Sequence, residues 1–136
     1  MITLNPHTEV ETLLRRAKTI AIVGLSAKEN RPSNMVGRYL LDAGYTIYPV
    51  NPGQTEIFGL KCYPSLTALP EKIDIVDIFR RSEEVLPFVE EAVKIGAGAV
   101  WMQLGIINHE AAAYARRHGL TVIMDRCIKV DHSNLL

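Results

Sequence analysis

The residues best suited to chemistry lie in a polar loop between an apolar run and a proline. The run covers residues 19–23, Gly24 follows it, and Pro32 stands at the far end of the loop. A continuous apolar run is typical of a buried parallel strand, and proline is favoured in the first turn of a helix. The free N–H groups at such a helix start suit phosphate, and Arg31 and Ser33 stand at this start. We therefore predict a phosphate-binding strand–loop–helix, with an ordinary turn that holds no ligand as the alternative.

Polar, cationic and aromatic residues also mark the ends of the later apolar runs. Ligands of open α/β sheets bind beyond the carboxyl ends of parallel strands, where the strand order reverses. A groove with these residue types suits a phosphorylated ligand that has an aromatic or heterocyclic part. A solvated helix start is the alternative for Arg80 and Arg81, and a plain core position is the alternative for Trp101. The residues concerned are Asn51, Pro52, Phe79, Arg80, Arg81, Trp101, Gln103 and Gly105.

The loop does not match the standard nucleotide-binding fingerprints. In a G-x-G-x-x-G alignment Gly24 takes the first position, but Ser26 and Glu29 take the other two. NAD enzymes also place a carboxylate at the end of the second strand, to bind the ribose, and residues 50–52 contain none. The Walker pattern G-x-x-x-x-G-K-[ST] is absent from the sequence as well. These departures argue against NAD and against ATP hydrolysis.

The sequence also contains no complete catalytic or metal-binding motif. The G-x-S-x-G elbow of hydrolases is not formed, because Lys28 replaces its last glycine. The histidines show no H-x-x-x-H or H-E-x-x-H spacing, and Cys62 and Cys127 show no C-x-x-C spacing. Asp77 lies within a buried strand, where we expect a hydrogen-bonded structural carboxylate. We expect a binding protein rather than an enzyme, and no metal site.

Composition and charge indicate a globular protein with no overall attraction to nucleic acid. The chain has 136 residues, and its 15 basic and 15 acidic side chains give a formal net charge of zero. No apolar stretch approaches the roughly 20 residues of a membrane span, and the N-terminus has no signal-peptide pattern. Two cysteines without a pairing framework are typical of a reducing compartment. We expect a cytoplasmic protein that binds a small molecule, with no nucleic-acid or membrane partner.

Apolar periodicity predicts strands that alternate with helices. Such alternation implies right-handed crossovers and a parallel sheet covered on both faces. We therefore predict an α/β fold, a single Rossmann-like domain over residues 1–136 with its core at about 19–127. The sheet should be doubly wound, mainly parallel and five- to six-stranded. Its first strand should be central, with the second strand and a short edge piece on one side and the rest on the other. The expected strands are 19–23, 46–50, 74–79, 99–102 and 120–124, with the edge piece within 58–63.

Helices are expected around these strands, and capping residues indicate where they begin and end. Thr8 and Asn108 would cap the first and the fourth helix, and Gly44 would end the second. The tail from Lys129 onward is expected to fray. The expected helices cover residues 8–18, 32–43, 82–95 and 110–118.

Five motifs, in order along the chain, carry a resemblance to a known family. They are Gly24-Leu-Ser26 with Arg31-Pro32-Ser33, Tyr48-Pro-Val-Asn51-Pro52, Val76-Asp77-Ile78-Phe79-Arg80, Trp101-Met-Gln103-Leu-Gly105 and Met124-Asp125-Arg126-Cys127. Together they resemble the small stand-alone CoA-binding domain proteins of bacteria and archaea (the YccU-like group), over nearly the whole chain. The sequence is also similar to the CoA-binding domain of the succinyl-CoA synthetase α subunit, but it has no counterpart of that enzyme's catalytic phosphohistidine domain.

The resemblance implies a Rossmann-like domain that binds coenzyme A or an acyl-CoA without catalysing a reaction. One departure is Gly53, which follows Pro52 where many relatives have a lysine. Losing that cation would leave the phosphates more dependent on Arg31 and Arg80. The implied contacts are Gly24, Leu25, Ser26, Ala27, Arg31 and Ser33 for the pyrophosphate, Asn51 and Pro52 for the adenosine end, Phe79, Arg80 and Arg81 for the ribose phosphate or pantetheine, and Gln103 and Gly105 for the remaining wall, beside Trp101.

Two alternative functions stay open at this point. One is a divergent NAD(P)-dependent oxidoreductase built on the same sheet. The other is a redox-regulated protein in which Cys127 forms a mixed disulfide with the CoA thiol, helped by the neighbouring Arg126. An inert, half-buried cysteine is the plainer interpretation of Cys127.

Overall fold

A five-stranded parallel sheet organises the molecule in the computed structural model, which describes residues 6–136. The strand order is β2-β1-β5-β6-β7, and all neighbouring strands are parallel. The order reverses at β1, so the predicted arrangement around a central first strand is confirmed. The strands are β1 (Thr19–Val23), β2 (Thr46–Val50), β5 (Ile75–Ile78), β6 (Ala99–Met102) and β7 (Thr121–Ile123).

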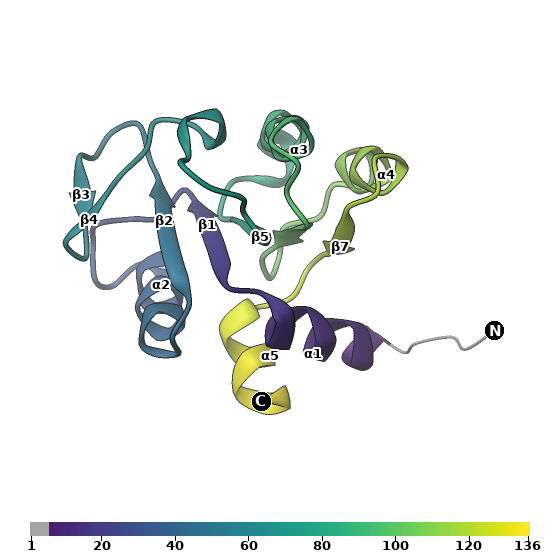
Figure 1. The fold of residues 1–136 in the computed structure, drawn as a ribbon, viewed down its shortest axis with the longest axis horizontal. Helices are drawn as coiled ribbons and strands as arrows, with labels where there is room; N and C mark the ends of the chain where they lie inside the picture. The colour runs from purple at the N-terminus through teal and green to yellow at the C-terminus, as the bar shows by residue number, and fades with distance from the viewer. Residues whose placement is uncertain (1–5) are drawn as a thin grey trace.

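Helices cover both faces of this sheet, as Figure 1 shows. The helices α1, α2 and α5 pack on one face, and α3 and α4 pack on the other. None of the helices described between residues 6 and 136 has the length and apolar character that crossing a membrane requires. The helices are α1 (Pro6–Arg16), α2 (Pro32–Asp42), α3 (Val85–Lys94), α4 (His109–Arg117) and α5 (Ile128–Leu135), with short 3-10 turns η1 (Leu66–Ala68) and η2 (Ser82–Glu84).

Strand β1 separates two apolar cores. Ala21 and Val23 belong to the core under α3 and α4, whereas Ile20 and Ile22 belong to the core under α1, α2 and α5. Every residue of β1 is buried, because both faces of the strand are covered. This double cover explains why the strand consists of a continuous apolar run rather than an alternating one.

The first helix begins earlier than predicted. It starts at Pro6, so Thr8 lies inside its first turn, and the prediction that Thr8 is the N-cap is wrong. Proline at a helix start explains the difference, because its fixed φ favours the helix and its missing N–H is not needed there.

The short edge piece does not extend the main sheet. Residues Glu56–Ile57 (β3) and Leu60–Lys61 (β4) instead form an antiparallel hairpin of their own. Phe58 and Gly59 both have positive φ, at 59° and 76°, as a tight two-residue hairpin turn requires. After this hairpin, a single parallel bridge between Tyr63 and Val50 connects the chain to β2.

The C-terminal segment forms a packed helix, so the prediction of a frayed tail is wrong. Ile128, the first residue of α5, has a fully buried side chain, and the backbone N–H of Ile128 donates to Gln103 Oε1 at 3.2 Å. Asp131 is buried and accepts from Arg126 Nε at 2.6 Å, and the Tyr39 hydroxyl lies 2.8 Å from His132 Nδ1. The contacts with Gln103 and Tyr39 come from residues far away in the chain, and the local sequence does not signal them.

Asp77 differs from its predicted environment. It lies in the middle of β5, between Ile22 of β1 and Trp101 of β6, and its side chain is completely buried. Neither carboxyl oxygen has a hydrogen-bond partner within residues 6–136, so the prediction of a hydrogen-bonded carboxylate is wrong. Burial raises the pKa of Asp77 well above its usual range, because a charge there would lose its hydration without gaining a partner.

Candidate ligand-binding site

Gly24 allows the end of β1 to lie against the end of β5. Its φ is +82°, and a Cβ at this position would stand 2.4 Å from the Phe79 carbonyl oxygen. Its N–H donates to the Val50 carbonyl at 3.0 Å, which ties the turn to β2 as well. Any other L residue would meet both an unfavourable φ and a backbone clash. Only glycine therefore fits at this position, where the chain leaves β1 and enters the loop.

Three side chains hold the loop that follows Gly24. Ser33 Oγ accepts from the Ser26 N–H at 3.0 Å, and Asn34 Nδ2 donates to the Ser26 carbonyl at 2.8 Å. Asn51 Nδ2 donates to the Leu25 carbonyl at 2.9 Å. Ser33 and Asn34 are buried, although they lie in the first turn of α2. The loop is thus preorganised, and sequence reasoning missed Asn34, whose only signal was a polar residue on the buried face of the helix.

The N-terminus of α2 opens toward the loop. Its N-cap residue, Arg31, makes no side-chain capping hydrogen bond, and Pro32 occupies the first turn. In this first turn Pro32 has no N–H and the Asn34 N–H donates to the Arg31 carbonyl at 3.0 Å, which leaves the Ser33 N–H for a ligand. The dipole of the 11-residue α2 also concentrates positive potential at this end. This end of α2 suits a negatively charged group.

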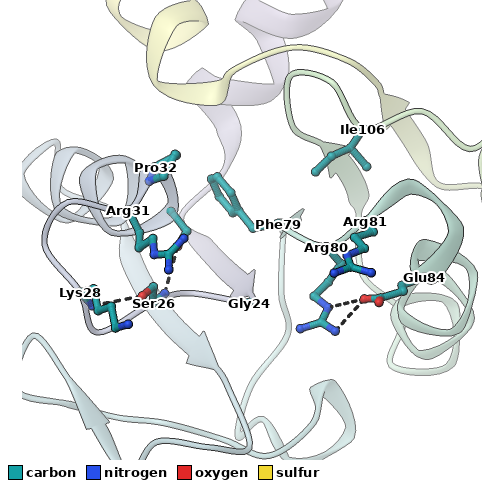
Figure 2. A pocket seen from close by; sticks show the side chains of 11 residues that line it. Gly24, Ser26, Lys28, Arg31, Pro32, Phe79, Arg80, Arg81, Glu84 and Ile106 are labelled. Atoms are coloured by element: carbon teal, nitrogen blue, oxygen red, sulfur yellow. Dashed lines mark hydrogen bonds and ion pairs between the residues drawn. The ribbon is translucent and has the colours of Figure 1, made fainter.

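A cleft of about 650 Å³ lies between this helix end and the start of α3. Figure 2 shows the loop and Arg31 on one wall, with Arg80, Arg81 and Glu84 on the opposite wall. The cations around it outnumber the single carboxylate, so the cleft attracts anions although the whole chain is neutral. The lining residues are Gly24, Ser26, Lys28, Arg31, Pro32, Ser33, Phe79, Arg80, Arg81, Glu84 and Ile106.

The four cations of the cleft are not equivalent. Arg80 is held by Glu84, with Nη2 and Nε at 2.6 and 3.0 Å from Oε2, and its guanidinium lies 5.9 Å from the Phe88 ring centre. For Lys28, Arg31 and Arg81, the structure of residues 6–136 contains no ion pair. These three cations can therefore meet an anionic ligand without first losing a carboxylate partner.

A second cavity of about 310 Å³ adjoins the first one. The two share Gly24, Ser26, Lys28 and Arg80, so they lie on either side of the same loop. The second cavity is bounded on its far side by the end of β2 and the residues after it. Its other lining residues are Val23, Ala27, Val50, Asn51, Pro52, Gln54, Pro64 and Phe88.

Three of the proposed contact residues are buried and line neither cavity. Leu25 and Trp101 are fully buried, and Gln103 is 4% exposed. Trp101 Nε1 donates to the Arg126 carbonyl at 2.8 Å, and Gln103 Oε1 accepts from Ile128 at 3.2 Å. Trp101 and Gln103 thus connect β6 to the start of α5 and are not among the residues that line the cleft.

Gly105 lies at the edge of the cleft rather than in its lining. Its φ is +84°, and its N–H donates to Asp125 Oδ1 at 2.7 Å. The next residue, Ile106, lines the cleft instead. Sequence reasoning missed Ile106, Lys28 and Glu84 as lining residues. For Glu84 the four-residue spacing from Arg80, typical of an ion pair on a helical turn, was the available signal.

Comparison with known proteins finds similarity to small proteins of about the same length and to one part of a CoA ligase. The Bacillus subtilis protein YneT is 46% identical over 130 residues, which span 95% of this chain and 96% of YneT. A hypothetical protein from Pyrococcus horikoshii, 40% identical, superposes with a TM-score of 0.93 over 99% of both chains. An ADP-forming acetate–CoA ligase of Archaeoglobus fulgidus is 32% identical over 87% of this chain, which corresponds to only 19% of that ligase.

The family model described as "CoA binding domain" matches residues 18–133. This range includes all five strands of the sheet, both sides of the cleft, and most of α5. With the match extending over nearly the whole chain, this protein belongs to the CoA-binding domain family.

Proposed function

We propose that this protein binds coenzyme A in the cleft, with the phosphates over the residue 24–28 loop and the N-terminus of α2. The observation that carries the proposal is a helix end without a side-chain cap, facing a cleft whose cations outnumber its carboxylate. Anionic phosphate oxygens would accept from the Ser33 N–H in the first turn of α2 and from the Arg31 side chain. The family match supports CoA as the source of these phosphates.

The second cavity is the proposed site of the adenosine part. Val50, Pro52 and Pro64 offer apolar surface, and Phe88 offers a ring. Arg80 and Lys28 line both cavities, so they would stand between the base and the pyrophosphate. This division gives the charged and the heterocyclic parts of one ligand separate, adjoining spaces.

The site favours CoA over NAD(P) on chemical grounds. An NAD site needs a carboxylate at the end of β2, and this position holds Asn51, whose amide is already engaged with the Leu25 carbonyl. The lining contains one carboxylate, Glu84, which is paired with Arg80. We therefore propose binding without turnover, since the cleft presents no nucleophile with an adjacent base.

Thermal unfolding with different nucleotides tests this proposal. A ligand that binds the folded state at 100 times its Kd stabilises it by about 2.7 kcal/mol, so CoA is expected to raise the Tm by several degrees. NAD, NADP and ATP at the same concentration serve as controls for phosphate binding in general. An unchanged Tm at millimolar CoA, or a larger shift with NAD than with CoA, would overturn the proposal.

Arg31→Ala is expected to weaken CoA binding by about ten- to a hundredfold, because it removes a charged donor at the proposed phosphate site. The Tm without ligand should stay within about 2 °C, since Arg31 is exposed and forms no ion pair in the described residues. Isothermal titration calorimetry measures the affinity. The matched control is Arg116→Ala, an exposed arginine at the far end of α4, for which CoA affinity should not change. Equal affinities for the two variants would mean that the loop is only a turn.

A further inference from the structure

The cleft has apolar side chains toward one end. Figure 2 shows Ser26 and Lys28 at one end, and Pro32, Phe79 and Ile106 around the other, where Arg31 and Arg81 are drawn as well. Together, Pro32, Phe79 and Ile106 form what we call the apolar ledge. A ligand that needed only phosphate contacts would have no use for this second end.

Two exposed apolar side chains flank Ile106 in the loop after β6. Leu104 is 71% exposed and Ile107 is 43% exposed, whereas Ile106 between them is half-buried. Single exposed apolar residues are ordinary on protein surfaces, but here two lie within four residues of one loop, beside an apolar residue that lines the cleft. Connecting loops at the carboxyl edge of a parallel sheet usually carry the groups that contact a ligand.

Hydrogen bonds hold this apolar loop in place. The N–H of Ile106 donates to the Gln103 carbonyl at 2.9 Å, and the N–H of Ile107 donates to Ser82 Oγ at 2.9 Å. Asn108 Nδ2 donates to the Ser82 carbonyl at 2.8 Å, so the loop is attached to the start of α3 at two points. The apolar side chains are therefore presented from a fixed backbone.

From this arrangement we infer that the cleft selects CoA thioesters of apolar acyl groups over free CoA, with the acyl chain on the apolar ledge. The inference rests on the proposed function, because the phosphates must occupy the end with Ser26 and Lys28 for the acyl chain to reach the other end. Burying each added methylene should strengthen binding by about two- to fourfold, depending on how much of it the ledge covers.

Calorimetric titration with CoA, acetyl-CoA, butyryl-CoA and hexanoyl-CoA tests the inference. We expect hexanoyl-CoA to bind at least about tenfold more tightly than CoA, with butyryl-CoA between them. If all four bind with one affinity, the inference is overturned and the proposed function stands. If none of them binds, the proposed function fails as well.

Ile106→Ser locates the acyl contact. This variant should reduce the preference for hexanoyl-CoA to within about threefold of CoA, with the two affinities compared in the same variant. Leu104→Ser, at a more exposed position, gives a second variant with little risk to folding. Val130→Ser is the matched control, because Val130 is 52% exposed on α5 and does not line the cleft. If Ile106→Ser weakens CoA and hexanoyl-CoA equally, the ledge contacts the pantetheine arm and the inference is wrong.

Discussion

Replacing Gly24 by alanine is expected to destabilise the protein by about 3 kcal/mol, to lower its Tm by roughly 10 °C, and to weaken CoA binding at least about tenfold. The new Cβ would stand 2.4 Å from the Phe79 carbonyl oxygen, and the residue would keep a φ of +82° that L residues rarely adopt. Because the obstacle is backbone, relief requires β1 and β5 to move apart at their carboxyl ends. That movement would displace the loop on which the phosphates are proposed to lie.

Gly119→Ala separates the two contributions to this effect. Gly119 has the same φ of +82°, but nothing lies within 4 Å of its Cβ position. Its substitution should therefore cost only the conformational part, about 1–2 kcal/mol, and leave CoA affinity unchanged. Urea denaturation and calorimetry on both variants measure the difference. Equal losses of stability in the two variants would show that the contact with Phe79 relaxes without cost.

Asp77→Asn is expected to stabilise the protein increasingly as the pH rises. The folded protein keeps the Asp77 carboxyl protonated, since burial without a partner raises its pKa well above the ordinary 3.8. Above about pH 4 the unfolded chain releases this proton and the folded protein does not, so rising pH favours unfolding. The loss amounts to about 1.4 kcal/mol per pH unit, and it continues until the folded carboxyl itself ionises. Asparagine has the same shape but does not ionise, so the variant lacks this pH-dependent loss of stability.

The measurement is the free energy of unfolding in urea at pH 5, 6, 7 and 8. The quantity that matters is the difference between Asp77→Asn and the unchanged protein, because other groups titrate equally in both. Asp42→Asn, which changes an exposed carboxylate at the end of α2, is the matched control variant. If the Asp77→Asn difference does not change with pH, the Asp77 carboxyl is ionised or paired in solution.

Much of the fold could be predicted because its strongest signals are local. The run from Thr19 to Val23 must be buried on both faces, and Pro32, Gly44 and Asn108 mark helix ends through their own backbone chemistry. These features depend on neighbours within a few residues. The strand order was then predicted from the rule that strand–helix–strand crossovers are right-handed, and the observed order agrees with that prediction.

The predictions failed where the deciding contact is distant in sequence. The segment from Lys129 has little helical pattern, yet it folds as part of α5 because Gln103 and Tyr39, both distant in the chain, hold that helix. Asp77 was expected to have a hydrogen-bond partner, since most buried carboxyls do. Which side chains surround a strand residue depends on the helices packed above it, and no local rule supplies that information.

The sequence by itself determined the strand–loop–helix at Gly24 and the order of the sheet, and it predicted an anionic ligand, because glycine, proline and arginine act through their own geometry and charge. Only the tertiary structure decided which motif residues line the cleft. It buries Trp101 and Gln103 beneath the start of α5, assigns Asn34 and Asn51 to holding the loop, and brings Ile106 into the cleft. The physical reason is that carboxyl ends of parallel strands share one edge, but burial at that edge depends on the packing of every element around it.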